Sequence, residues 1–238
     1  MNIKKICVFD FETDGTNPEE CNPVQLAAII VDPRKLKIIK EASFESGIRP
    51  PAIDDDDYFE NHKSTIEWHS RISNCTTDEI IKRWKQNPSE SDVWQSFTTW
   101  LGKYHTKQSR QTIFTAPIAC GYNIEDFDLP IIKRLATKYG DIRKDGTPKV
   151  FNPRDRIDML KIVFWWFENQ DEPTSYSMDT MRKYFAISDE DAHDALGDVK
   201  DTADLMIKFL KTQRWVTGHL LEKGKLKGSF NEPITSTI

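Results

Sequence analysis

The sequence predicts an α/β protein with a mixed sheet that begins as an antiparallel meander. Strand-like segments come first, one more follows later, and helical periodicity dominates the rest of the chain. The 238 residues, 38% hydrophobic and 11% aromatic, suffice for one substantial core. We therefore expect one main domain over residues 1–212, followed by a basic C-terminal extension over residues 213–238.

Four segments have the composition of strands. Residues 6–13 (ICVFDFET) and 24–32 (VQLAAIIVD) are rich in β-branched and aromatic side chains. Residues 37–50 (KIIKEASFESGIRP) follow the turn-like DPRK, so the first three strands are expected to form the meander. Residues 112–123 (TIFTAPIACGYN) are expected to form a fourth, largely apolar strand.

Apolar residues at helical spacing predict the remaining elements. The expected helices are 92–104 (DVWQSFTTWLGKY), 129–140 (LPIIKRLATKYG), 157–167 (IDMLKIVFWWF), 175–185 (SYSMDTMRKYF) and 198–213 (DVKDTADLMIKFLKTQ). Ser91 is a candidate cap for the first of them, and Pro130 and Gly140 mark the two ends of the second. Trp165 and Trp166 are expected to lie in the core or to cover the sheet.

Charge, cysteine content and hydropathy limit the class of protein. The net charge of −5 is unusual for a nucleic-acid-binding protein, although residues 208–227 are basic. The four cysteines form no CxxC pair, which fits reduced thiols and argues against structural zinc. The chain contains no apolar run of about 18 residues and no signal-peptide pattern. We expect a soluble, cytoplasmic protein without membrane contact.

Two acidic residues at alternate positions of the first strand are the main functional signal. Asp10 and Glu12 should point to one face of the strand, while Phe9 and Phe11 point to the other. Neighbouring carboxylates repel each other, and burying them without a partner is costly. A divalent cation between them is therefore the first candidate, with an exposed strand edge as the alternative.

Two later segments supply further candidates for the same site. Asp128, in GYNIEDFDLP, stands at the entry of a helix after the fourth strand, where sites at the end of a sheet commonly lie. His193 and Asp198 lie five residues apart in AHDALGDVKDT. The alternatives are a helix cap for Asp128, with Asp126 competing for its metal role, and an ordinary surface or core position for His193. Asp158 could cap a helix or support the site.

The three segments FDFETDG, GYNIEDFD and AHDALGDVKDT resemble the motifs of the DEDD exonuclease superfamily, in the branch with histidine in the third motif. Around them, PVQLAAIIVD, RIDMLKIVFWWF and SYSMDTMRKYFAIS are similar to the nuclease domain of bacterial exonuclease I. The segment STIEWHS, within residues 50–110, is closer to small phage-type exonucleases. The resemblance spans roughly residues 5–212 and implies a ribonuclease H-like fold.

The resemblance also implies a reaction, the removal of 5′-mononucleotides from a 3′ end. Asp10, Glu12, Asp128 and Asp198 would hold two Mg²⁺ ions, with Mn²⁺ as a substitute, and His193 would be the general base. Two cations stabilise the attacking and leaving oxygens of a phosphodiester displacement, and hard cations prefer carboxylate ligands. A histidine can accept the proton of the attacking water near neutral pH.

The implied partner is a nucleic acid with a free 3′ end. Single-stranded DNA is favoured, and RNA is the alternative. Thr13, Asp14 and Gly15 directly follow the first motif's acids, and their backbone would receive the 3′-terminal nucleotide. Tyr122 and Asn123, beside the second motif, are further candidates for substrate contacts. No protein partner is indicated.

Two other functions are compatible with parts of the pattern. ETDGT resembles the DxDGT signature of haloacid-dehalogenase-type phosphatases, but Glu12 stands where that chemistry needs a nucleophilic aspartate. A catalytically idle binding subunit with a nuclease fold is the other alternative. All five motif positions are filled in this chain, which an idle subunit would not require.

Overall fold

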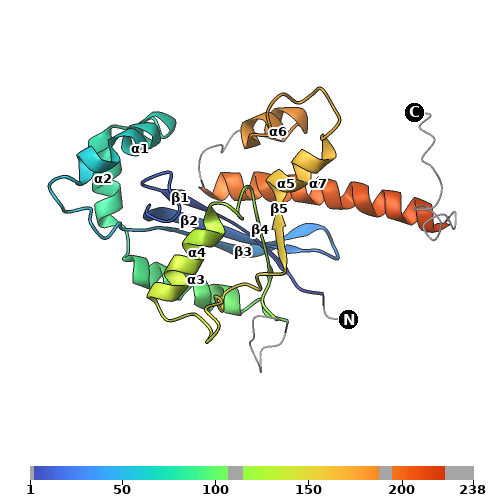
Figure 1. Cartoon of the computed structure of the whole chain (residues 1–238), viewed down its shortest axis with the longest axis horizontal. Helices are drawn as coiled ribbons and strands as arrows, with labels where there is room; N and C mark the ends of the chain where they lie inside the picture. Colours follow the sequence, from blue (N-terminus) through green and yellow to red (C-terminus); the bar gives the residue numbers. More distant parts are fainter. Residues whose placement is uncertain (1–2, 107–114, 188–194, 223–238) are drawn as a thin grey trace.

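The protein, as seen in a computed structural model, has a mixed five-stranded sheet with helices on both faces (Figure 1). The structure describes residues 3–106, 115–187 and 195–222. The strands are β1 (Ile6–Thr13), β2 (Pro23–Asp32), β3 (Lys37–Gly47), β4 (Ile118–Gly121) and β5 (Arg156–Asp158). The helices are α1 (Tyr58–Ile72), α2 (Thr77–Gln86), α3 (Glu90–Gly102), α4 (Asp128–Lys138), α5 (Met159–Trp166), α6 (Met178–Tyr184) and α7 (Ala195–Glu222).

The sheet confirms the predicted α/β fold class. Its strand order is β3-β2-β1-β4-β5. β1 pairs antiparallel with β2, and β2 with β3, as expected for the meander. β1 and β5 both run parallel to β4. β1 is therefore central, and the carboxyl ends of three parallel strands lie at the same edge of the sheet.

Side chains of β1 alternate between two hydrophobic cores. Phe9 and Phe11 face a cluster built with α3 and α4, in which Phe9 stacks on Phe151 with ring centroids 5.1 Å apart. Ile6 and Val8 face a second cluster built with α5, α6 and α7. Because side chains alternate along a strand, Asp10 and Glu12 lie on the face that α7 covers.

Several elements differ from the sequence-based expectation. Helices α1 and α2 were not assigned from the sequence, and Figure 1 shows them together at one end of the sheet. The cap of α3 is Ser89, whose Oγ accepts the N–H of Asp92 at 3.2 Å, so the prediction of Ser91 was wrong. Trp165 and Trp166 were expected to lie in the core or to cover the sheet, but they are 71% and 50% exposed, so neither lies in the core.

Two further expectations from the sequence concern the thiols and membrane-spanning helices. All four cysteines are free thiols, as predicted. Among the described residues, no helix combines the length and the apolar character needed to cross a membrane.

Helix α7 continues past position 212, the predicted domain boundary. From this helix, Arg214 donates to the carbonyl of Pro33 in the β2–β3 connection.

Candidate active site

Carboxylates from three elements meet at the carboxyl end of β1. Asp10 and Glu12 are half-buried on the strand itself. Asp128 begins α4, directly after the loop that follows β4. Asp198 lies in the first turn of α7, with 25% of its side chain exposed. The structure thus brings together all the predicted motif acids, whereas the fifth motif residue, His193, lies outside the described residues.

Asp128 is fixed by the backbone of the first motif. It is 2% exposed, and its Oδ1 accepts the N–H of Phe11 at 2.9 Å. The N-cap position of α4 belongs to Phe127, so Asp128 is the first residue of the helix and not its cap. The competing Asp126 has 72% of its side chain exposed and lies 4.0 Å from Lys161. The buried carboxylate beside the other acids is therefore Asp128.

The acids of this cluster affect one another electrostatically. Burial raises the pKa of Asp10 well above its ordinary value, and the charges of Asp128, Glu12 and Asp198 raise it further. Burial likewise raises the pKa of Asp128 from 3.8 to about 7, although hydrogen bonds from backbone N–H groups oppose the change. A cluster that favours protons in this way has a deficit of positive charge, which a divalent cation could supply.

The donor chemistry fits a hard divalent cation. All four motif acids offer carboxylate oxygens, the ligands that Mg²⁺ and Mn²⁺ prefer. Within residues 3–106, 115–187 and 195–222, no three acidic, histidine or cysteine side chains are arranged as a ready-made metal site. The charges of Glu12, Asp128 and Asp198 act on Asp10, and cation binding by these four carboxylates stays a prediction.

Asp158 supports the loop of the second motif. It is 5% exposed, and its carboxylate accepts the N–H groups of Asn123 and Glu125 at 3.0 Å each. The same carboxylate caps α5 by accepting the N–H of Leu160 at 3.0 Å. The sequence left a cap and a supporting role open, and the structure shows both. Asp158 thereby fixes the backbone that leads into Asp128.

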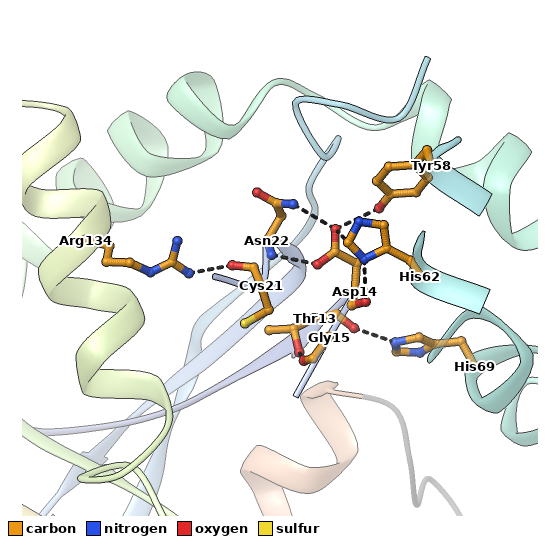
Figure 2. A network of polar contacts seen from close by, with 9 residues as sticks. All are labelled: Thr13, Asp14, Gly15, Cys21, Asn22, Tyr58, His62, His69 and Arg134. Atoms are coloured by element: carbon orange, nitrogen blue, oxygen red, sulfur yellow. Dashed lines mark hydrogen bonds and ion pairs between the residues drawn. The ribbon is translucent and has the colours of Figure 1, made fainter. Parts of the chain in front are cut away.

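A second polar network fixes the backbone after Glu12 (Figure 2). Asp14 is fully buried and accepts hydrogen bonds from the backbone N–H of Asn22 at 2.7 Å and its side-chain amide at 2.8 Å. The hydroxyl of Tyr58, from α1, donates to the same carboxylate at 2.8 Å. The side chain of Asp14 therefore makes its polar contacts inside the protein.

Two histidines of α1 complete this network. His62 donates from Nδ1 to the carbonyl of Asp14 at 2.9 Å, and His69 donates from Nε2 to the carbonyl of Thr13 at 2.9 Å. A carbonyl oxygen can only accept, so each of these ring nitrogens carries the proton. Burial lowers the pKa of His69, which favours its neutral form. α1 thus holds the segment in which the sequence placed the substrate backbone contacts.

Sequence reasoning missed this role of α1. The signal was the spacing of Tyr58, His62, Ile66 and His69, which places all four on one face of a helix. Only one of the four is an aliphatic residue, so a search for apolar periodicity counts a single position of this face.

The other predicted substrate residues have these surroundings. Thr13 donates from Oγ1 to the carbonyl of Gly15 at 2.6 Å. The hydroxyl of Tyr122 donates to the carbonyl of Tyr176. Asn123 adopts a left-handed backbone conformation with φ of 63°. Gly15 is half-buried against Cys21, whose Cβ would lie 3.3 Å from an added Cβ. Substrate contact by these residues stays a prediction.

Comparison with known proteins places the chain in a family. Over residues 5–209 it matches the family described as the Rv2179c-like 3′-5′ exoribonuclease domain. The chain belongs to this family. The predicted membership of the DEDD-type 3′-5′ exonucleases is thereby confirmed. Members of this exonuclease family are nucleases, enzymes that hydrolyse phosphodiester bonds, so the predicted enzyme class is confirmed too. No curated protein sequence matches the chain.

Solved structures similar to this family member confirm the ribonuclease H-like fold. Escherichia coli exonuclease I in complex with a dT13 oligonucleotide is 19% identical, with a TM-score of 0.67 over 92% of this chain and 44% of that chain. The zinc-bound form of the E. coli exonuclease I–ssDNA complex is 20% identical, with a TM-score of 0.65 over 95% and 45%. Cell-death related nuclease 4 (CRN-4) is 15% identical, with a TM-score of 0.60 over 89% and 65%. The chain spans less than half the length of exonuclease I.

Proposed function

We propose that this chain is a divalent-metal-dependent 3′-5′ exonuclease that releases 5′-mononucleotides from single-stranded nucleic acid. The observation that carries the proposal is the convergence of the three motifs at the carboxyl end of β1. There, the pKa of Asp10 is raised first by burial and then by the charges of Asp128, Glu12 and Asp198. The family match supports the same reaction class.

Each motif residue has a specific role in the proposed mechanism. Asp10, Glu12, Asp128 and Asp198 would hold two Mg²⁺ ions, with Mn²⁺ as a substitute. When bound, the cations stabilise charge on the attacking and leaving oxygens. His193 takes the proton of the attacking water, a role that rests on the resemblance of the third motif. The N–H of Phe11 keeps the Asp128 carboxylate oriented toward β1.

The substrate binds where the network of Figure 2 fixes the backbone. The backbone of residues 13–15 receives the 3′-terminal nucleotide, and Tyr122 and Asn123 flank it from the second motif. The family description favours RNA as the polymer. Single-stranded DNA is the second candidate, favoured by the sequence resemblance to exonuclease I and by the oligonucleotide bound to that similar structure.

The domain boundary and the subcellular location are also part of the proposal. Residues 1–212 would form the nuclease domain, and residues 213–238 a basic extension that adds phosphate contacts weakened by salt. The four free thiols fit the reducing cytoplasm, where the protein would meet its substrate.

A gel time course tests the proposed function and the choice of polymer together. RNA and DNA of one single-stranded sequence, labelled at the 3′ or the 5′ end, are incubated with Mg²⁺, Mn²⁺ or EDTA. We expect shortening from the 3′ end of RNA, dependent on the metal and absent in the Asp198→Ala variant. Shortening of DNA alone would favour the second polymer, and no cleavage of either would contradict the proposal.

A further inference from the structure

Arg182 is a buried cation next to the acid cluster and belongs to none of the three motifs. It lies in α6, and only 3% of the residue is exposed. Its guanidinium pairs with Asp179 and with Asp201 at 2.6 Å each, and also with Asp198. A single side chain thus connects Asp198 to Asp179 and Asp201, two carboxylates that are not among the predicted metal ligands.

The packing of α6 fixes this guanidinium in place. Ser177 caps the helix by accepting the N–H of Thr180 at 3.3 Å. Met181 is fully buried in the core cluster that also contains Val199 of α7. The planar guanidinium offers donors in a rigid fork, so three carboxylates define its orientation. Arg182 therefore connects α6 to the amino-terminal end of α7, because its partner Asp198 lies in the first turn of that helix.

The local charge balance determines how Arg182 would act on a bound cation. An isolated positive charge near the site would repel a divalent ion. Here one guanidinium faces three carboxylates, so its surroundings remain negative. The contact with Asp198 can therefore orient that carboxylate without making the site repulsive for a cation.

We propose that Arg182 is a positioning residue of the cation site, which binds Asp198 and holds its carboxylate ready to share a divalent ion with the acids of β1. This inference rests on the proposed function, because it assumes that the four motif acids bind the metal. Groups that orient metal ligands through hydrogen bonds commonly change metal affinity by roughly 10–100-fold when they are removed.

Mn²⁺ binding to the full chain, measured from the electron paramagnetic resonance signal of the free ion, tests this role without requiring nuclease activity. Arg182→Met keeps an apolar stem but loses the guanidinium, and we expect about tenfold weaker Mn²⁺ binding. Arg182→Lys keeps the charge but not the fork, so its affinity should lie between those of wild type and Arg182→Met. This conservative variant also covers the case in which Arg182→Met does not fold.

Asp179→Asn is the matched control. It removes a charged partner of the same guanidinium, but the Asp179 side chain is 56% exposed and belongs to no motif. Because exposed ion pairs contribute little, we expect Mn²⁺ affinity within about twofold of wild type. Circular dichroism of each variant checks that its overall helix content and its thermal transition match those of wild type.

The outcomes separate this inference from the proposed function. Unchanged or tighter Mn²⁺ binding in both Arg182 variants would overturn it, as would an equally large loss in Asp179→Asn. A folded wild type that binds no Mn²⁺ would overturn the inference together with the cation site. If the affinities follow the expected order while the wild type degrades neither RNA nor DNA, the inference holds and the proposed function fails.

Discussion

Removing the buried carboxylate of Asp128 should stabilise the metal-free protein while abolishing activity. Burial raises the pKa of this group from 3.8 to about 7, so the folded state binds the proton more tightly than the unfolded state. Stability must then fall as the pH rises from about 4 to about 7, and it stays low above that range. Asp128→Asn removes this loss, because the carboxamide stays neutral and can still accept the N–H of Phe11.

The structure sets the size of the effect. Each tenfold change in proton affinity corresponds to about 1.4 kcal/mol. A pKa raised from 3.8 to about 7 therefore lowers the free energy of unfolding by about 4 kcal/mol once the pH is above that range. Burying the carboxamide still has a desolvation cost, so we expect a gain of roughly 2–4 kcal/mol at about pH 8. For a chain of this size, the melting temperature should rise by roughly 5–15 °C.

Thermal unfolding in EDTA, followed by circular dichroism from about pH 4 to about pH 8, measures this difference. The Asp128→Asn variant should match wild type at the acid end and exceed it at the alkaline end. Saturating Mg²⁺ should stabilise wild type and leave the variant unchanged. A variant that is no more stable than wild type at about pH 8 would refute the reasoning.

Three further predictions concern the residues that support the site. Asp158→Ala leaves three backbone N–H groups without their acceptor. The free energy of unfolding measured in urea should therefore fall by about 3 kcal/mol or more. Tyr58→Phe removes a donor from the fully buried Asp14, and the same measurement should show a loss of about 1–3 kcal/mol. Gly121→Ala would place a Cβ 2.8 Å from the carbonyl oxygen of Phe9. We expect this variant to be less stable by about 1–3 kcal/mol and to cleave more slowly. Wild-type stability of the variant would contradict the close approach.

The central part of the fold could be predicted because its signals are local. In β1, a period of two separates Phe9 and Phe11 from Asp10 and Glu12, and this alternation alone places the acids on one face. In the register of the sheet, β4 pairs with residues 6–8 of β1, so Asp10 and Glu12 lie beyond this pairing, toward the carboxyl end of β1. Asp128 was predictable for the same reason, since it follows a strand and begins a helix.

Other features depend on contacts that sequence spacing does not contain. Arg182 meets Asp198 from 16 residues away, and Asp158 meets Asn123 from 35 residues away. The exposed Trp165 belongs to a helix whose residues are all apolar except Lys161, and only Met159 and Val163 of this helix are buried. With a single charged residue, the segment has no clear polar face, so its apolar content does not reveal which side is covered.

The central claim is that the motif acids form the metal site of an exonuclease, and single-turnover release of the 3′-terminal mononucleotide tests it most directly. Wild type is compared with Asp10→Asn and with Asp126→Asn, a matched change in an exposed carboxylate. With Mg²⁺, we expect Asp10→Asn to slow release by about a thousandfold or more, because a bound cation lowers the activation free energy by several kcal/mol. Asp126→Asn should retain the wild-type rate. Equal rates for the two variants, or wild-type release that persists in EDTA, would contradict the claim.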